Sequence, residues 1–306
     1  MSPVVSVIVP VYKGRDFVAR AVASARSQTY SRVEIVVVND GSPDDSQRVL
    51  QPYLDLPNVK YVEKSNGGVA SARNAGLSVS TGEFVALLDQ DDVWYPQKLE
   101  RQVAVLSRHP EVALVHADVT YIDADDAVLP RNPYFPAAVE GRCFERFFMA
   151  NPVMACTALF RRSVVDAVGG FDEAIRFSDD YDLWLRIVRH HAVAYIDEPL
   201  AMYRVHGDNE SRKTGGIVGA TMQTLRKALQ TIPDCRALVG DANVRLRFAR
   251  LESALSRFHF SQHQWPRFAW HFLQAVRHDR KTASEFGLPA PALDRLRWYG
   301  KRLGLR

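Results

Sequence analysis

The chain has 306 residues, a formal net charge of +4, 47% apolar residues and 24% charged residues. These proportions are typical of a folded globular protein and exclude a disordered one. No apolar stretch approaches the roughly 18 residues needed to span a bilayer.

The cysteines and the first residues indicate the compartment. Cys143, Cys156 and Cys235 are widely spaced and form no Cys-x-x-Cys pair, which argues for a reducing compartment and against structural zinc. The apolar segment 4–11 has no basic residue before it and is too short for a secretory signal, so we expect a first strand there. The sequence therefore predicts a cytoplasmic protein.

The first hundred residues alternate between strand and helix patterns. Continuous β-branched runs predict buried strands, and apolar residues at helical spacing predict the helices between them. Such alternation is typical of a parallel sheet with helices on both faces. In chain order we expect strand 4–9, helix 16–28, strand 33–38, helix 44–54, strand 58–63, helix 69–77, strand 84–88 and a helix that begins at Pro96.

The later part of the chain has a mixed pattern and then a basic one. From Lys213 onward there are 17 basic and 6 acidic residues, against 22 basic and 29 acidic before it. We therefore expect two parts, residues 1–212 as an α/β domain with a mostly parallel sheet and residues 213–306 as a basic helical extension. Further expected elements are strands over 113–122 and 157–161, a helix over 180–190 with Trp184 facing inward, and two short strands over 193–196 and 201–204.

Residues 89–92, Asp-Gln-Asp-Asp, form an acidic cluster directly after the apolar run 84–88. Carboxylates at the end of a buried strand are costly unless a cation lies among them. Mg and Mn take oxygen ligands and share them with substrate phosphates, so the cluster suggests a metal–diphosphate site. A solvated acidic loop is the alternative. An EF-hand is excluded because Trp94 stands where that loop requires glycine.

A second group of carboxylates, Asp179, Asp180 and Asp182, opens the helix expected near residue 180. Acidic residues at a helix start complement the helix dipole, which is an ordinary structural role. Three within four positions exceed what capping needs. One that faces a cleft could act as general base on a hydroxyl, with its pKa raised by its neighbours.

Other polar residues follow the expected strands, at the edge of the sheet where ligands bind. Tyr12 could stack on a nucleobase, and Asp40 could accept a hydrogen bond from a base N–H group. The Asn-Gly-Gly turn at 66–68 could present backbone N–H groups, and Arg73 a fixed cation, although Asn and Gly also form ordinary turns. Neither a Walker A motif nor a dinucleotide fingerprint is present.

His206 follows the last expected strand, within the polar segment 203–211. A lone histidine is more often structural, but its neighbours, among them Arg204, favour a polar site. We expect His206 to contact a metal ion or a diphosphate.

Five motifs stand in the order found in family 2 glycosyltransferases with the GT-A fold, and the chain resembles that family over about residues 3–212. The motifs are Val-Ile-Val-Pro-Val-Tyr, Val-Asn-Asp-Gly-Ser, Asn-Gly-Gly-Val-Ala-Ser-Ala-Arg-Asn, Leu-Asp-Gln-Asp-Asp and Asp-Asp-Tyr-Asp-Leu-Trp-Leu-Arg. The segment 203–211 is similar to the one that follows the family's catalytic core. The resemblance implies an inverting transfer of a sugar from a nucleotide diphosphate donor to a hydroxyl, with a GT-A catalytic domain over residues 1–212.

The resemblance also implies roles for single residues. Asp180 would be the base that deprotonates the acceptor, on the face opposite the leaving group. Asp91 would coordinate the Mn or Mg that neutralises the diphosphate, with His206 as a second metal contact. Among the donor-binding residues, the resemblance implies that Asp89 approaches the ribose and that the nucleoside pocket is lined by Pro10, Val11, Tyr12, Asp40 and Arg73. We expect Asn66, Gly67 and Gln90 to bind the donor as well. The supporting residues would be Asp179, Trp184 and Arg204.

The C-terminal part departs from the processive members of the family. Those members carry Gln-x-x-Arg-Trp followed by membrane spans, whereas here Asp294 stands at the Gln position before Arg297 and no span follows. We therefore expect one sugar to be added per encounter. The segment 293–303 is typical of a basic amphipathic helix on an anionic membrane surface. The aromatic residues of 245–306, among them Phe260, Trp265 and Phe268, are expected to pack onto the core as a small helical subdomain.

These observations predict the partners and leave two other functions open. The expected partners are a nucleotide-diphospho-sugar, a glycan or lipid-linked acceptor and the inner face of a membrane, with no nucleic acid. A sugar-phosphate nucleotidyltransferase would need a Gly-rich basic loop after the first strand, which residues 10–15 supply poorly. A non-catalytic nucleotide-sugar-binding protein would be expected to lack Asp91 or Asp180, and both are present.

Overall fold

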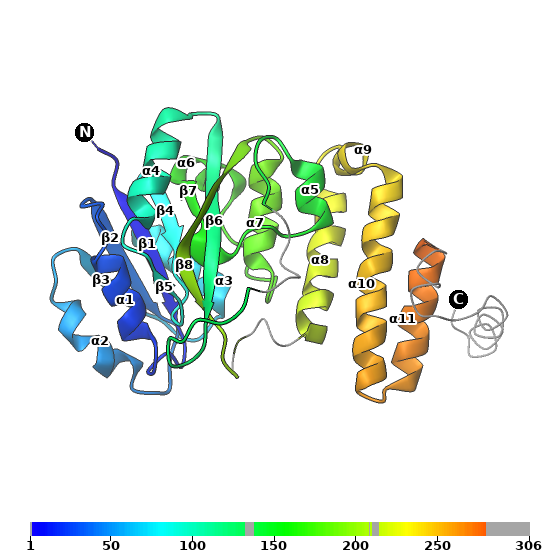
Figure 1. The fold of residues 1–306 in the computed structure, drawn as a ribbon, viewed down its shortest axis with the longest axis horizontal. Coiled ribbons are helices and arrows are strands. Elements are labelled where there is room, and N and C mark those ends of the chain that lie inside the picture. The colour runs from blue at the N-terminus through cyan, green and yellow to red at the C-terminus, as the bar shows by residue number, and fades with distance from the viewer. Residues whose placement is uncertain (1, 132–137, 208, 210–213, 280–306) are drawn as a thin grey trace. The chain divides into compact units, whose positions relative to one another are not determined.

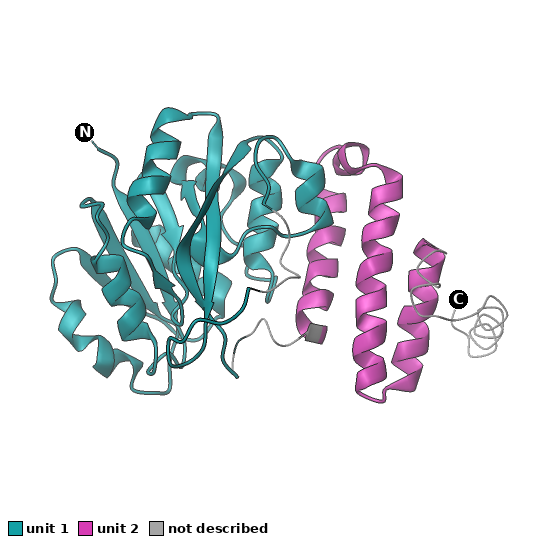
Figure 2. Ribbon diagram, viewed as in Figure 1, with its two compact units in different colours: residues 1–209 teal, residues 210–306 magenta. Residues whose placement is uncertain are grey.

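The computed structural model describes residues 2–131, 138–207, 209 and 214–279. The chain divides into two compact units, residues 1–209 and 210–306 (Figure 2). The boundary expected between residues 212 and 213 lies outside the described residues, and so does the basic helix expected over 293–303.

An eight-stranded sheet forms the centre of the first unit, in the order β3-β2-β1-β4-β7-β6-β8-β5 (Figure 1). The pairs among β1, β2, β3 and β4 are parallel, as is the pair β6–β8, while β7 and β5 run antiparallel to their neighbours. The predicted α/β fold with a mostly parallel sheet is confirmed. The strands are β1 Val5–Val11, β2 Val33–Asn39, β3 Val59–Glu63, β4 Phe84–Leu87, β5 Val93–Trp94, β6 Val112–Ile122, β7 Leu159–Arg161 and β8 Ala192–Arg204.

Helices bury both faces of this sheet, because alternate residues of each central strand point to opposite sides. In β2, Ile35 packs in the same core as Val22 of α1, whereas Val36 packs with Ala72 of α3 on the other face. The helices of the first unit are α1 Val18–Arg26, α2 Ser46–Leu54, α3 Val69–Val79, α4 Lys98–Arg108, α5 Phe144–Met149, α6 Arg162–Val168 and α7 Asp179–Val188, with a 3-10 turn at Ala155–Thr157.

One prediction about the strands is wrong. The sequence predicts two short strands over 193–196 and 201–204, but the structure has the single bent strand β8. Both halves pair with β6, and the register jumps so that Ala117 faces Ile196 while Asp118 faces Pro199. Proline lacks an N–H group and imitates a turn signal, yet a bulge accommodates it inside the strand.

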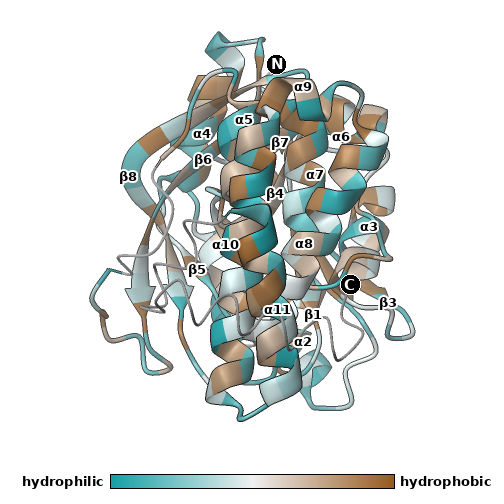
Figure 3. Cartoon of the chain, turned by 90° about the vertical axis from the view of Figure 1, so that its right-hand side faces the viewer, coloured by the Kyte–Doolittle hydropathy of each residue, from teal (hydrophilic) through white to brown (hydrophobic). Residues whose placement is uncertain are grey.

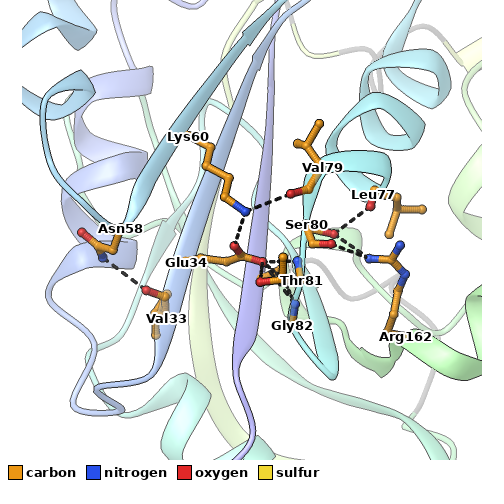
Figure 4. Close-up of polar contacts among 11 residues, drawn as sticks. Val33, Glu34, Asn58, Lys60, Leu77, Val79, Ser80, Thr81, Gly82 and Arg162 are labelled. Carbon is orange, nitrogen blue, oxygen red and sulfur yellow. Dashed lines mark hydrogen bonds and ion pairs between the residues drawn. The ribbon is translucent and has the colours of Figure 1, made fainter.

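A buried carboxylate, Glu34, organises the edge of the sheet where β1, β2 and β3 begin (Figure 4). Its Oε1 accepts hydrogen bonds from Ser6 Oγ (2.5 Å), Thr81 N (2.5 Å) and Gly82 N (3.1 Å), and its Oε2 pairs with Lys60 Nζ at 2.8 Å. Burial alone would raise the pKa of Glu34, but the hydrogen bonds from Lys60, Ser6 and Thr81 outweigh it and lower the pKa to about 2.

Replacing Glu34 with glutamine should therefore lower the free energy of unfolding near neutral pH by about 1–3 kcal/mol. A lowered pKa means that the carboxylate contributes stability above its ordinary pKa of 4.5 and loses it as the pH falls toward 2. Thermal unfolding at pH 7 and pH 3 should show the difference between wild type and variant shrinking in acid. The exposed Glu83→Gln variant is the control, and equal melting temperatures for the Glu34 variant and wild type at pH 7 would contradict this role.

The second unit is helical over its described part. No helix in the described ranges is long and apolar enough to cross a membrane. Its helices are α8 Thr214–Thr231, α9 Cys235–Val239, α10 Asp241–Ser261 and α11 Trp265–His278.

Candidate active site

Asp40 follows β2 at the carboxyl edge of the sheet and shapes the loop after β3. Its side chain is buried, and its carboxylate accepts hydrogen bonds from the N–H groups of Gly67 (3.0 Å) and Gly68 (2.8 Å) and pairs with Lys64 Nζ (2.7 Å). Asn66 adds a bond from Nδ2 to the Asp40 carbonyl at 3.0 Å. The expectation that these N–H groups point to a donor therefore needs correction, because Asp40 already binds them.

Tyr12 directly follows β1 and is 42% exposed. The side-chain amide of Gln90 accepts from Tyr12 N at 2.8 Å and donates to Tyr12 O at 2.9 Å. Gln90 thus holds the Tyr12 backbone against the acidic cluster and leaves the ring at the surface, while its own amide is engaged. The side chains of Pro10 and Val11 are buried, so any contact of these two with a nucleoside would come from the backbone.

Arg73 of α3 joins the two acidic motifs. Its guanidinium donates from Nη2 to Asp89 Oδ1 at 2.8 Å and from Nη1 to Asp179 Oδ2 at 2.7 Å, and only 5% of its side chain is exposed. Burial alone would lower the pKa of Arg73, but Asp179 and Asp89 raise it above its usual range, so the group stays charged. Arg73 thus connects the end of β4 to the start of α7, and its contact with the donor stays a prediction.

Asp180 is the half-buried carboxylate next to that connection. Burial raises the pKa of Asp180 to about 7, the charge of Asp179 acts in the same direction, and Arg73 opposes both. Asp180 Oδ1 accepts a hydrogen bond from Tyr181 N at 2.7 Å. A carboxylate that titrates near neutral pH matches the requirement for a general base, because it is ionised at working pH and still attracts a proton.

Asp91 and His206, the two predicted metal contacts, lie against each other. Asp91 Oδ2 is 2.9 Å from His206 Nε2 and accepts a hydrogen bond from Asn209 Nδ2 at 3.2 Å. No cluster of three or more His, Cys, Asp or Glu side chains surrounds a metal position in the described residues. The chemistry of this pair fits Mn or Mg held by two protein ligands, since such ions complete their shell with substrate oxygens.

Arg204, at the end of β8, holds the acidic cluster in place. Its side chain is fully buried, Nε donates to Asp91 O at 2.8 Å, and its own N–H donates to Asp92 Oδ1 at 2.9 Å. Nη1 pairs with Asp126 at 2.6 Å, and the guanidinium lies 4.9 Å from the centre of the Phe17 ring. Arg204 therefore supports the site by fixing its backbone.

Trp184, which the sequence places facing inward on α7, lies in the core of the first unit. It is fully buried, and its ring meets Phe160 edge to face at 5.5 Å. Trp184 therefore packs α7 onto β7, and a supporting role for it in the site stays a prediction.

Three residues that the sequence patterns did not single out complete this edge: Lys64, Asn209 and Asp126. Each is polar and follows the end of a strand, which is the signal that identified Asp40 and Asp89. Their roles depend on their partners Asp40 and Arg204, which the sequence does not reveal.

Comparisons with known proteins show which sequences the chain is similar to. An uncharacterized glycosyltransferase of Rickettsia prowazekii is 33% identical over 210 residues, which cover 67% of this chain and 65% of that protein. The chain thus spans just under two thirds of that relative's length. The hyaluronan synthase of Pasteurella multocida is 29% identical over 219 residues, 70% of this chain and 22% of that enzyme.

Solved structures show the fold. S. aureus TarS 1-349 in complex with UDP-GlcNAc superposes with a TM-score of 0.67 at 19% identity, over 90% of this chain and 83% of that one. The mannosyltransferase PcManGT from Pyrobaculum calidifontis, in complex with GDP-Man and Mn2+, gives a TM-score of 0.64 at 21% identity, over 100% and 81%. The fold is of GT-A type with C-terminal helices. Residues 6–169 match the profile of Glycosyl transferase family 2, and the chain belongs to that family.

Proposed function

We propose that the chain catalyses an inverting, non-processive transfer of a sugar from a nucleotide diphosphate donor to an acceptor hydroxyl. The observation that carries this proposal is the Arg73 bridge: one guanidinium binds Asp89 of the acidic cluster and Asp179 beside Asp180. It brings a carboxylate suited to proton transfer next to the carboxylates suited to a diphosphate-bound cation. Family membership and neighbours in complex with UDP-GlcNAc or GDP-Man support a nucleotide-sugar donor.

Each residue of the site has its own role in the proposed reaction. Asp180, ionised, takes the proton of the acceptor hydroxyl as that oxygen attacks the anomeric carbon, and the bond to the diphosphate breaks on the opposite face. Tyr12 offers an exposed ring on which the nucleobase stacks. Asp91 and His206 would hold Mn or Mg, which when bound neutralises the charge that develops on the departing diphosphate. The Mn2+ in the PcManGT complex supports this choice of ion.

The acceptor and the location belong to the same proposal. We expect a glycan or lipid-linked acceptor of cell-surface assembly, and a protein that works in the cytoplasm, peripherally on the inner face of the membrane. The likeness to polysaccharide synthases such as the P. multocida hyaluronan synthase supports a glycan acceptor.

A panel of nucleotide-diphospho-sugars tests the proposed function. Purified protein is incubated with each donor and Mn or Mg, and the release of nucleoside diphosphate is measured, with Asp180→Asn as the inactive reference. We expect release from one or a few donors only. Consumption of a nucleoside triphosphate with release of pyrophosphate would replace the proposal with a nucleotidyltransferase.

Replacing Asp91 with asparagine should lower kcat/KM by roughly 100-fold and remove the metal dependence of donor binding, because a neutral amide is a poorer ligand for a hard cation. Thermal shift with the donor, with and without Mn, measures the binding. Asp125→Asn, an exposed carboxylate on a nearby loop, is the matched control and should behave as wild type. Full activity of the wild-type protein in a chelator would refute the metal role.

A further inference from the structure

The turn between α10 and α11 carries aromatic side chains at the surface of the second unit. Phe260 is 52% exposed and Trp265 is 54% exposed. Their rings meet edge to face with centroids 5.3 Å apart, and both contact Phe268, at 5.4 and 6.2 Å. Phe268 lies 6.0 Å from Phe272, which is fully buried. We call Phe260, Trp265 and Phe268 the aromatic tip.

The turn that carries the aromatic tip is fixed by hydrogen bonds. Gln264 donates from its backbone N–H to His259 O at 2.9 Å, and its Oε1 lies 2.8 Å from His259 Nδ1. The rings are therefore held outward by a defined backbone. Exposing large apolar side chains to water is unfavourable in free energy. A contiguous exposed group of them is typical of a surface that binds a protein, a ligand or a membrane.

The exposed charged residues within 250–278, the segment that contains the aromatic tip, are positive. Within residues 250–278 the only carboxylate is Glu252, whose side chain is 1% exposed and lies 2.6 Å from His271. Arg257 and Arg267 are exposed on either side of the turn. Figure 3 shows hydrophobic and hydrophilic residues interspersed along α10 and α11.

We propose that the aromatic tip docks on an anionic lipid surface. Tryptophan and phenylalanine rings enter the boundary between headgroups and acyl chains, and Arg257 and Arg267 face the lipid phosphates. A second copy of this chain is a poorer partner because two basic tips would repel each other. Single-stranded nucleic acid prefers open ring faces along a groove, whereas these rings meet edge to face on a turn. The residues of the aromatic tip differ from the segment 293–303, for which the sequence predicts membrane contact.

Co-sedimentation of the full chain with phospholipid vesicles tests the proposal. We expect binding to phosphatidylcholine vesicles that contain phosphatidylglycerol, weaker binding in high salt, and at least a 10-fold loss of binding for the Phe260→Ser/Trp265→Ser variant. The control is Leu238→Ser in α9, which removes another apolar side chain, 41% exposed, from the same unit. Leu238 lies before the 21-residue helix α10 and the aromatic tip lies at its other end, so the two are separated by the length of that helix, about 30 Å.

Several results would overturn the proposal. The first is that the wild-type protein does not bind anionic vesicles, and the second is that the double variant and the control variant lose equal amounts of binding. The third is that the double variant abolishes a dimer or an oligonucleotide complex but still binds vesicles. Hydrogen exchange of the unmutated protein gives a second measurement that does not depend on a variant folding. Slower exchange over residues 259–268 on addition of anionic vesicles supports docking, and unchanged exchange there contradicts it. Donor hydrolysis without vesicles should be unaffected by the double variant, which separates this proposal from the proposed function.

Discussion

Replacing Asp180 with asparagine should abolish transfer, with kcat reduced by roughly 1,000-fold or more, while donor affinity stays within a few-fold of wild type. Asparagine keeps the shape of the side chain but cannot accept a proton. The measurement pairs a transfer assay with donor binding by calorimetry in the presence of Mn. Loss of donor binding together with transfer would show that Asp180 holds the donor and is not the base.

The stability of this variant should move in the opposite direction from its activity. The pKa of Asp180 is raised from 3.8 to about 7 in the folded chain, so the ionised form is disfavoured by folding. Its contribution to stability is complete below pH 3.8 and is lost as the pH rises through 7. At pH 8 the Asn variant should therefore be more stable than wild type, by about 1–4 kcal/mol.

A neighbouring carboxylate offers the matched control for Asp180. Asp182 lies two residues further along α7, is buried, and pairs with Arg186 at 2.8 Å. Asp182→Asn removes a partner from that cation, so it should lower the melting temperature and leave transfer within a few-fold. An inactive but unstable Asp180→Asn variant would instead mean that the loss of activity comes from damage to the fold.

The pH dependence of wild-type transfer follows from the same group. Because Asp180 must be ionised to accept a proton, log(kcat/KM) should rise with a slope of about one below its pKa and level off above it. The burial and the charge of Asp179 that raise this pKa to about 7 place the bend near neutral pH. A profile that is already flat at pH 5 would exclude Asp180 as the titrating base.

The fold was accessible from the sequence where a single strand or helix carries its own signal. The continuous apolar runs of β1, β2 and β4 are buried on both faces and leave no other assignment open. Strands that form only because they pair with another strand were either not predicted or were predicted as two separate strands. β5 has two residues that are extended because they pair with β8, and β8 continues through Pro199 because β6 holds both halves.

The candidate site shows the same limit at the level of side chains. Residue type and strand-end position identified Asp40, Asp89 and Arg73 as members of one edge. Which of them bind each other is decided by distances across α3, β4 and α7 that no local pattern contains. The structure shows that Gly67, Gln90 and Arg73 each bind another part of the site, which the sequence does not reveal, while their contacts with a donor stay predictions.

Replacing Arg73 with methionine should lower the free energy of unfolding by about 3–5 kcal/mol, because it leaves Asp89 and Asp179 near each other without the buried cation that binds both. The loss should be smaller in acid, where the carboxylates can protonate. Arg73 also lowers the pKa of Asp180, so its removal should move the pH profile of any residual transfer upward. Urea unfolding at several pH values and the pH profile measure these effects.

Two further variants decide between this bridge and a direct donor contact. Arg73→Met/Asp179→Asn should regain part of the stability, since one of the unpaired carboxylates is gone, and the coupling follows from a double-mutant cycle. Arg20→Met is the matched control, because Arg20 pairs with Asp126 at the same 2.7 Å but both side chains are more than 40% exposed. This variant should lower the free energy of unfolding by about 1 kcal/mol or less. If Arg73 instead served the nucleoside, Arg73→Met would raise the donor KM without destabilising the protein. If Arg73 is a bridge, Arg73→Met should lower the stability of the protein more than it weakens donor binding, because the guanidinium already binds two carboxylates of the protein.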